Sequence, residues 1–438
     1  MAGELCCRVL VMLVSEVKSE YEEEYTMRRN NLMAIVLAGI MAAGALSGCG
    51  GSGSTATAAG TEGNMGTEAA KEEVKEGGAA SEPESAGASA ASSGQEDGMS
   101  YDDLVAAAKE EGGLVFYGAN SYLQDAADRF AKEFGIKVEF TQLGETEMIE
   151  KITSECQSGA VSADLVCAQD TYRVMAELVD TGYAMKWSNP RVGEIVGNDD
   201  CTALIWYYDT KSFMYNDELV GEGWLTNLWR IADPQYKGLF TMKDPSSEGV
   251  NFDMLTMLTS DGYASRLADA YKEYFGKDIT LTTDNAGWEF IKMMFQNGVL
   301  LTTSDTTSAT TVGALGQSDT WVGYFSTQRF STQDDKGIKL SYDLSSCNPV
   351  GGYAYPVYSI ILDNCQHPNT AKLFSEWLLS ENGWAAFNDY YGGFSANPAN
   401  VHATDYSFDE VKGNIVLDDP DYLVNHRADV EDFIETLR

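Results

Sequence analysis

The sequence predicts an α/β protein with two lobes, and three observations support this fold class. Strand-like and helix-like segments alternate over residues 101–179, an order that is typical of a parallel sheet with helices on both faces. After Cys201 the pattern changes, and two long strand-like segments appear. Residues 101–438 also exceed the length that packs around one ordinary core. One sheet, interrupted by a second lobe and then rejoined by the chain, accounts for these features better than two tandem domains.

The first lobe begins with a helix signal. Ser100 and Asp103 are spaced as in a capping box and predict a helix over residues 101–111. The alternation that follows predicts strands over 114–117, 138–142 and 164–167 and helices over 121–134, 148–156 and 171–179. Because ligands of parallel sheets bind beyond the carboxyl ends of the strands, we expect the site near residues 118–121, 144–146 and 168–170.

The remainder of the chain continues the mixture of helices and strands without an internal repeat. The pattern predicts long strands over 203–209 and 213–216, mixed elements over 225–325, strands over 338–342 and 357–362, and helices over 370–379 and 384–390.

A short apolar run near the N-terminus is typical of a secretory signal peptide. Arg28 and Arg29 precede the apolar residues 32–46, a run shorter than the roughly 20 residues that span a bilayer. The run leads into Leu-Ser-Gly-Cys, which resembles a bacterial lipobox. We therefore expect a lipoprotein signal peptide over residues 27–48 and lipidation of Cys49.

The segments on either side of this leader have a different character. Residues 1–26 are partly acidic and fit no part of a signal peptide, so we interpret them as a mis-called N-terminal extension. Residues 49–100 are rich in Gly, Ala, Ser and Glu and have almost no large apolar side chains. Such a segment cannot bury enough surface to offset the entropy of ordering, which predicts a flexible acidic tether.

The composition excludes several classes of function. With 67 acidic and 29 basic side chains the net charge is −38, so a nucleic-acid binder that works through a basic face is excluded. The chain has three His, no HExxH or paired CxxC motif and no GxxxxGK[ST] loop. We also find no nucleophile–base pair at a motif spacing. We therefore expect neither an enzyme nor a cofactor.

The pattern of the cysteines favours free thiols over a set of disulfide bonds. The five that follow Cys49 are Cys156, Cys167, Cys201, Cys347 and Cys365. Their spacing matches no metal site, and their odd number leaves at least one unpaired within a single chain. We expect buried thiols, and the sequence leaves one disulfide open.

Six segments, in order, carry a family resemblance. They are the strand and helix over 114–138, the segment 147–166, Tyr215-Asn216, Asp233 to Gly238, Asp244 to Ser247, and Ala371 to Gly383 with its Ser-Glu-Asn-Gly end. Together, behind a lipobox and a tether, they resemble the extracellular solute-binding lipoproteins of ABC importers. The branch is the iron-type (ferric and organic anion) branch of the type II periplasmic-binding-protein family.

This resemblance implies a two-lobed type II fold in which each lobe has a central sheet flanked by helices. Hinge strands, expected near residues 203–208 and 337–342, join the lobes. The expected borders are 101–205 with 338–390 for lobe 1, and 206–337 with 391–438 for lobe 2. The resemblance also implies capture of a small solute in the interlobe cleft and delivery to an ABC permease and ATPase complex.

The same resemblance implies a place in the bacterial cell envelope. The protein would be a monomer, lipid-anchored on the outer face of the cytoplasmic membrane. A ligand-sensing lipoprotein for a membrane kinase could have the same sequence and stays open as an alternative.

The ferric-binding pattern of the family is poorly matched. Its His position falls on Ser121, its acid position on Gln169 and its Tyr pair on Tyr324-Phe325, so one of four ligands remains. Asp170, Tyr207-Tyr208 and Tyr390-Tyr391 could supply other donors, and a ferric iron importer therefore remains the alternative. We expect no metal ligands.

Hydroxyl groups at helix starts favour a small organic anion such as a phosphonate, a sugar phosphate or a carboxylate. Helix N-termini offer free N–H groups and a positive dipole end, and Arg329 could add a charge-assisted contact. The candidate ligand-binding residues are Asn120, Ser121, Thr146, Gln169, Asp170, Ser246, Ser247, Thr306, Thr307 and Tyr324.

Overall fold

The computed structural model describes residues 95–96 and 98–438. The expected extension, the signal peptide, Cys49 and almost all of the expected tether lie outside the described residues. None of the helices between residues 98 and 438 combines the length and the apolar character needed to cross a membrane.

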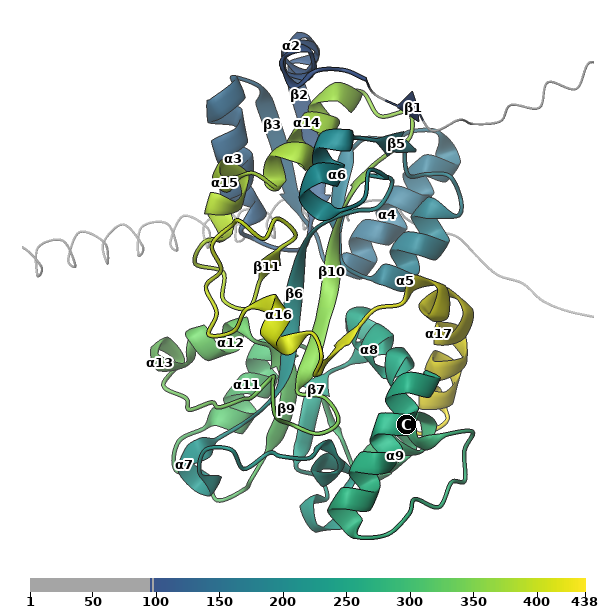
Figure 1. Ribbon diagram of the computed structural model, residues 1–438, viewed down its shortest axis with the longest axis vertical. Coiled ribbons are helices and arrows are strands. Elements are labelled where there is room, and N and C mark those ends of the chain that lie inside the picture. The colour runs from purple at the N-terminus through teal and green to yellow at the C-terminus, as the bar shows by residue number, and fades with distance from the viewer. Residues whose placement is uncertain (1–94, 97) are drawn as a thin grey trace, which may run out of the picture. The chain divides into compact units, whose positions relative to one another are not determined.

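One ten-stranded mixed sheet runs through the protein (Figure 1). Its main path has the order β3-β2-β4-β10-β6-β9-β7-β8, with β11 beside β6 and β12 beside β10. The strands are β2 (Gly113–Gly118), β3 (Lys137–Gln142), β4 (Leu165–Ala168), β6 (Leu204–Tyr215), β7 (Phe240–Lys243), β8 (Leu300–Thr302), β9 (Val322–Ser326), β10 (Gly352–Ile361), β11 (Phe394–Ser395) and β12 (Ile415–Leu417). A separate two-stranded sheet pairs β1 (Gln95–Glu96) with β5 (Trp187–Ser188).

The first lobe is the predicted parallel βα unit. β2 pairs in parallel with both β3 and β4, which confirms the alternation read from the sequence. Its helices are α2 (Tyr101–Glu111), α3 (Leu123–Phe134), α4 (Glu145–Ser158), α5 (Thr171–Arg173), α6 (Pro190–Val196), α14 (Pro368–Leu378) and α15 (Glu381–Trp384). α2 begins as predicted, because the Ser100 side chain accepts a hydrogen bond from the Asp103 N–H at 3.2 Å. Phe130 and Phe374 pack their rings 5.1 Å apart in the core beneath α3 and α14.

The second lobe surrounds β7, β8 and β9, which pair in parallel. Its helices are α7 (Asp217–Val220), α8 (Val250–Leu258), α9 (Asp261–Phe275), α10 (Ala286–Gln296), α11 (Asp305–Gly313), α12 (Gln328–Ser331), α13 (Gln333–Lys336), α16 (Phe408–Val411) and α17 (Pro420–Glu435). Trp229 is fully buried here and lies against Tyr271 and Phe290, with ring centroids 4.8 and 5.0 Å away.

Two long antiparallel strands, β6 and β10, pass through both lobes (Figure 1). β10 pairs with β4 of the first lobe, and β6 pairs with β9 of the second. The sequence split β6 into two strands because residues 209–212 (Asp, Thr, Lys, Ser) are polar, yet all four are buried. The protein is therefore two-lobed and joined by hinge strands, as predicted.

The predicted position of the second hinge strand is wrong. This strand is β10, over Gly352–Ile361, and not the segment 337–342. Residues Ile338 and Ser341 instead form isolated bridges to Ala314 and Tyr215, beside the second lobe. A segment that forms only isolated bridges can show the alternating apolar pattern of a strand, although it is not part of a long strand pair. The residue borders of the lobes stay a prediction.

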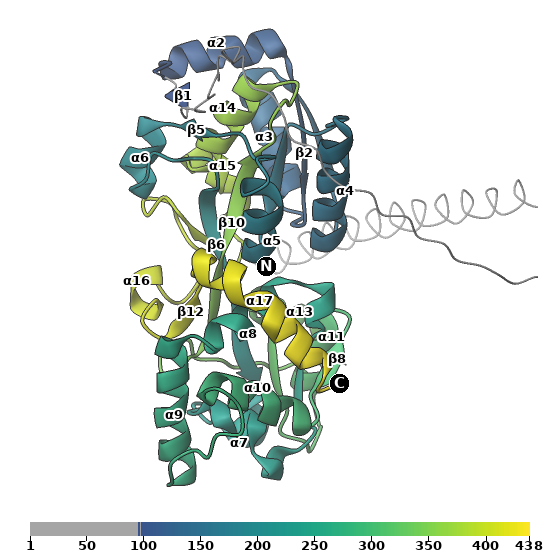
Figure 2. The same ribbon diagram turned by 90° about the vertical axis from the view of Figure 1, so that its right-hand side faces the viewer.

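The C-terminal helix α17 contacts elements of both lobes. It packs on α8 in the second lobe and on α5 in the first (Figure 2). The five cysteines of the described residues, Cys156, Cys167, Cys201, Cys347 and Cys365, all carry free thiols. No disulfide therefore links residues within the described part of the chain.

Candidate functional site

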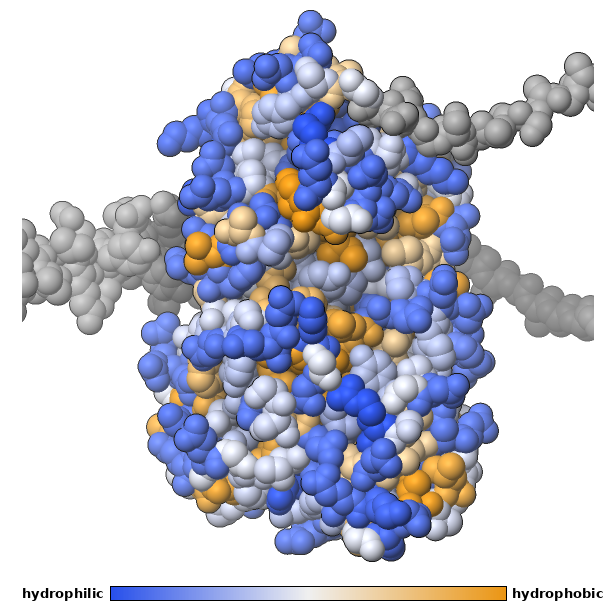
Figure 3. All heavy atoms as spheres, viewed as in Figure 1, coloured by the Kyte–Doolittle hydropathy of each residue, from blue (hydrophilic) through white to orange (hydrophobic). Residues whose placement is uncertain are grey.

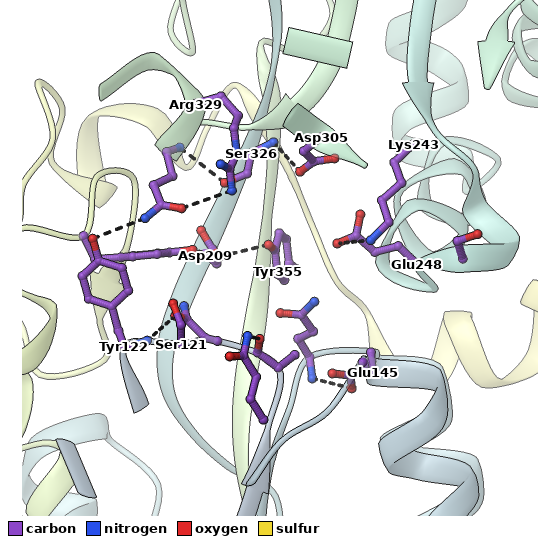
Figure 4. A pocket seen from close by; sticks show the side chains of 18 residues that line it. Ser121, Tyr122, Glu145, Asp209, Lys243, Glu248, Asp305, Ser326, Arg329 and Tyr355 are labelled. Carbon is purple, nitrogen blue, oxygen red and sulfur yellow. Dashed lines mark hydrogen bonds and ion pairs between the residues drawn. The ribbon is translucent and has the colours of Figure 1, made fainter. Parts of the chain in front are cut away.

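A polar cavity of about 340 Å³ lies between the lobes, in front of the hinge strands (Figure 4). It opens where the carboxyl ends of β2, β3 and β4 face the second lobe, as the topology of a parallel sheet requires. Its lining residues are Ala119, Asn120, Ser121, Tyr122, Gln142, Gly144, Glu145, Gln169, Asp209, Lys243, Ser247, Glu248, Asp305, Ser326, Gln328, Arg329, Tyr355 and Tyr390.

The wall from the first lobe is built on two turns. Between β2 and α3, the Asn120 side chain accepts a hydrogen bond from the Tyr122 N–H at 3.0 Å and donates to the Tyr207 hydroxyl at 3.4 Å. Asn120, and not Ser121, therefore orders the start of α3, which leaves the Ser121 hydroxyl available to a solute. The turn after β4 places Gln169 beside α4.

Glu145, the first residue of α4, stabilises the turn after β4. Its Oε1 atom accepts hydrogen bonds from the N–H groups of Gln169 at 2.9 Å and Asp170 at 3.3 Å. The side chain is almost fully buried, and its Oε2 atom has no partner among the described residues. Burial raises the pKa of the Glu145 carboxyl to about 8. A neutral, protonated Glu145 therefore predominates at pH 7.

The wall from the second lobe contains a buried charge network. Lys211 is fully buried on β6, and its ammonium group pairs with Glu248, donates to Asn251 Oδ1 at 3.0 Å and lies 3.5 Å from Asp305 Oδ2. Lys243 lies 3.6 Å from Glu248. The two lysines thus balance much of the charge of Glu248 and Asp305.

Asp209 forms the back wall, in the middle of β6. Its Oδ2 atom accepts hydrogen bonds from the hydroxyls of Tyr355 at 3.0 Å and Tyr390 at 2.7 Å, and Oδ1 accepts from the Thr210 N–H at 2.7 Å. Burial raises the pKa of Asp209 to about 6, and it raises the pKa of both phenols well above their ordinary value. Both phenols thus stay protonated and act as donors.

Arg329, on α12, is the cavity cation with the weakest internal pairing. No carboxylate of the described residues lies within 4 Å of its guanidinium, which donates only to Gln328 Oε1 at 3.4 Å. Figure 4 shows its side chain pointing from the second lobe toward the wall with Ser121 and Tyr122. The arrangement suits a solute group that carries negative charge.

Four of the ten predicted ligand-binding residues line this cavity. Asn120, Ser121 and Gln169 lie on the first-lobe wall, and Ser247 lies on the second-lobe wall. Thr146 lies one residue beyond Glu145 and outside the lining, where its carbonyl oxygen accepts a hydrogen bond from Arg173 at 3.4 Å.

The other predicted residues lie outside the cavity lining. Asp170 is buried and paired with Arg427 at 2.5 Å, and it also caps α5. Ser246 accepts a hydrogen bond from Arg438 at 3.0 Å. Thr306 and Thr307 lie in α11, and the Thr307 N–H is capped by Ser304. Tyr324 is fully buried, and its pKa is raised well above the ordinary value by burial.

The charged lining residues were missed, apart from Arg329. Glu145, Asp209, Glu248 and Asp305 look in the sequence like the solvated acids that a net charge of −38 makes common. One signal was present: Asp209 and Lys211 interrupt an otherwise apolar and aromatic strand. Buried charge in a strand marks a functional or paired site, because its desolvation must be offset.

A second cavity, of about 560 Å³, lies beside β6 at Tyr208. Tyr208 and Asp209 are successive strand residues, so their side chains point to opposite faces of the sheet. Apolar side chains of β11 and α16 line this second cavity, and hydrophobic patches gather about the middle of that face (Figure 3). The interlobe cavity is the candidate site, because it lies at the carboxyl ends of the parallel strands, where ligands of such sheets bind.

Comparison with known proteins identifies the family. The family model of bacterial extracellular solute-binding proteins matches residues 125–410, which is more than half of the chain. This protein therefore belongs to the bacterial extracellular solute-binding protein family. A sequence search against curated proteins found no match.

Solved structures of similar fold are binding proteins. Iron-bound HitA from Pseudomonas aeruginosa superposes with a TM-score of 0.57 at 17% identity, covering 74% of this chain and 99% of HitA. AfuA from Actinobacillus pleuropneumoniae, with fructose-6-phosphate bound, has a TM-score of 0.56 at 17% identity and covers 74% and 97%. IdiA (FutA) from Trichodesmium, in complex with iron and citrate, has a TM-score of 0.56 at 17% identity and covers 74% and 99%. At this identity the likeness establishes the type II periplasmic-binding-protein fold.

Proposed function

We propose that this protein is the solute-binding component of an ABC importer and that its solute is a small organic anion. A phosphonate, a sugar phosphate or a carboxylate would bind in the interlobe cavity and be delivered to a membrane permease. The observation that carries this proposal is Arg329, a cavity guanidinium without a carboxylate partner among the described residues. The Ser121 hydroxyl, at the N-terminus of α3, lies on the opposite wall and adds a donor.

The donor chemistry of the cavity favours an organic anion over ferric ion. Ferric ion prefers anionic oxygen donors, but the phenols of Tyr355 and Tyr390 are protonated and donate to Asp209. Glu248 is paired with Lys211 and Lys243, and Asp305 keeps one oxygen atom without a partner among the described residues, which is fewer anionic donors than ferric ion prefers. Tyr324, the one residue that matched the ferric pattern, lies outside the cavity lining. Iron-binding and sugar-phosphate-binding proteins share this fold. The choice between the two kinds of solute therefore rests on the residues of the cavity.

Calorimetry of the solute-free protein tests this proposal. Ethylphosphonate, glucose 6-phosphate and succinate are titrated, and we expect at least one to bind. Arg329→Gln should weaken that binding by about tenfold or more, because a charge-assisted hydrogen bond contributes about 1.5–3 kcal/mol. Ser121→Ala and Ser247→Ala should weaken it less. Arg129→Gln, on the exposed surface of α3, is the matched control.

Two results would overturn the choice of an organic anion. One is binding of every probe with equal affinity by wild type and Arg329→Gln. The other is tight ferric binding with a tyrosinate charge-transfer colour. Mass spectrometry of solute released from natively purified protein, together with metal analysis, gives an independent answer.

We also propose that the protein works in the cell envelope. A lipid on Cys49 would tether the binding protein beside its permease on the outer face of the cytoplasmic membrane. Membranes from cells that express Cys49→Ala should lose the protein, whereas wild type should stay with them. Retention of the variant by the membrane would contradict the anchor.

A further inference from the structure

Acids and cations both surround the interlobe cavity. Glu145, Asp209, Glu248 and Asp305 line it, whereas Lys243 and Arg329 are the lining cations and Lys211 lies beneath. Because Glu145 is protonated at pH 7, the three remaining acids are balanced by the three cations. A solute that carries only negative charge would disturb this balance, whereas a solute that carries one group of each sign would keep it.

The four acids are not equally available. Asp209 is held by two phenols and a backbone N–H, and Glu248 is paired with both lysines. Glu145 is bonded to two backbone N–H groups, and burial raises its pKa to about 8. Asp305 is different, because only Oδ2 is used: it accepts from the Ser326 N–H at 3.0 Å and lies 3.5 Å from Lys211.

Asp305 and Arg329 lie on the same wall of the cavity and do not pair with each other. Asp305 begins α11 and Arg329 lies in α12, and these two helices are in contact. Among the described residues, Asp305 Oδ1 and Arg329 Nε are both buried and without a hydrogen-bond partner. A buried polar atom without a hydrogen bond destabilises a protein by about 1–3 kcal/mol. An unpaired acceptor and an unpaired donor at one cavity therefore point to a ligand that forms hydrogen bonds with both.

We propose that the solute is a zwitterion, with its anionic group at Arg329 and a protonated amino group at Asp305. This inference rests on the proposed function and narrows it to small amino-substituted acids, such as an amino acid, an aminophosphonate or an amino-sugar phosphate. The cavity of about 340 Å³ is at the lower end of the range for small-molecule sites, which suits solutes of this size. Ion pairing with Asp305 would then distinguish the solute from its deaminated analogue.

The test uses pairs of probes that differ only in the amino group. They are 2-aminoethylphosphonate with ethylphosphonate, glucosamine 6-phosphate with glucose 6-phosphate, and β-alanine with propionate. Calorimetry on the full chain should find that wild type binds the amino member of at least one pair about tenfold or more tightly than its analogue. In Asp305→Asn this ratio should fall to about one, because Asn keeps the shape and an acceptor but not the charge.

Binding of the deaminated analogue by Asp305→Asn shows that the variant is folded and that its Arg329 side is intact. Asp125→Asn, on the exposed surface of α3, is the matched control and should keep the wild-type ratio. Equal affinities within every pair that binds, or a preference for the amino member that survives Asp305→Asn, would overturn the zwitterion and leave the anion site standing. Binding of no probe, or binding that Arg329→Gln leaves unchanged, would overturn the proposed function itself.

Discussion

At Glu145, burial and hydrogen bonding act in opposite directions on one carboxyl group. Burial disfavours the charged form, whereas the N–H groups of Gln169 and Asp170 favour it, and burial is the larger effect. The folded protein thus holds this proton up to pH of about 8, far above the ordinary carboxyl range. The unfolded chain releases it near its ordinary pKa of 4.5. Folding should therefore become less favourable as the pH rises between these two values.

We predict that Glu145→Gln removes this pH dependence. Gln keeps the acceptor for the two N–H groups but carries no charge at any pH. Between pH 5 and pH 9 the wild type should lose up to a few kcal/mol of stability relative to the variant, since one pKa unit corresponds to about 1.4 kcal/mol. Urea unfolding at both pH values measures the difference. The exposed Glu147→Gln, on the same helix, should follow the wild type, and parallel curves for Glu145→Gln and wild type would contradict the assignment.

Among the elements, α17 has a specific role, because one of its side chains binds both walls of the cleft. Arg427 is almost fully buried and donates to Asp170 of the first lobe at 2.5 Å and to Asp253 of α8 at 2.8 Å. Asp170 follows the cavity residue Gln169, and Asp253 lies five residues after Glu248. Arg427 therefore joins the two lobes beside the solute cavity.

We predict that Arg427→Gln destabilises the protein by about 3–5 kcal/mol, because it leaves two buried carboxylates without a cation. The midpoint of chemical denaturation measures the loss. Arg129→Gln, which breaks an exposed pair with Asp125, should change stability by less than about 1 kcal/mol. Asp170→Asn should likewise act on stability more than on solute affinity. If Asp170→Asn instead lowered the solute affinity strongly and left the stability unchanged, Asp170 would be a solute-binding residue.

For the whole molecule, the two hinge strands predict closure of the lobes around the solute. β6 and β10 are the long strands that the lobes share, and bending in their middle would change the width of the cavity. The hydrogen bond from Gln328 to the Tyr122 hydroxyl, at 3.4 Å, crosses from one lobe to the other. This contact should break when the lobes open.

We predict that the protein contracts when a bound solute saturates its cavity, because the two lobes close around it. Small-angle scattering should record a smaller radius of gyration with the best calorimetric probe than without it. The Arg329→Gln variant at the same probe concentration should keep the larger radius. Tight binding with an unchanged radius would exclude closure as the response to the solute.

The sequence predicted the fold well where the signals are local. The capping pair Ser100 and Asp103, the apolar face of α3 and the short buried strand β4 depend on neighbours within a few residues, and all three are present. The prediction failed where a long-range environment reverses a local preference. In the sequence, Asp209 and Lys211 indicate the end of a strand. In the structure they continue β6, because Tyr355 and Tyr390 bind Asp209 and Glu248 pairs with Lys211.

The sequence by itself determined the α/β class, the two lobes and the family, because helix and strand periods and the order of motifs are properties of the chain. It also placed the loops near residues 118–121 and 168–170 at the site, since the carboxyl ends of parallel strands meet at one edge. Only the tertiary structure decided which charges share the cavity. Asp209 and Asp305 are about a hundred residues apart in the sequence, and Arg329 lies in a different helix from Asp305. Whether each of them is paired depends on side chains that the fold brings within a few ångströms. Pairing and burial decide what a charged group can bind, and neither is a local property of the sequence.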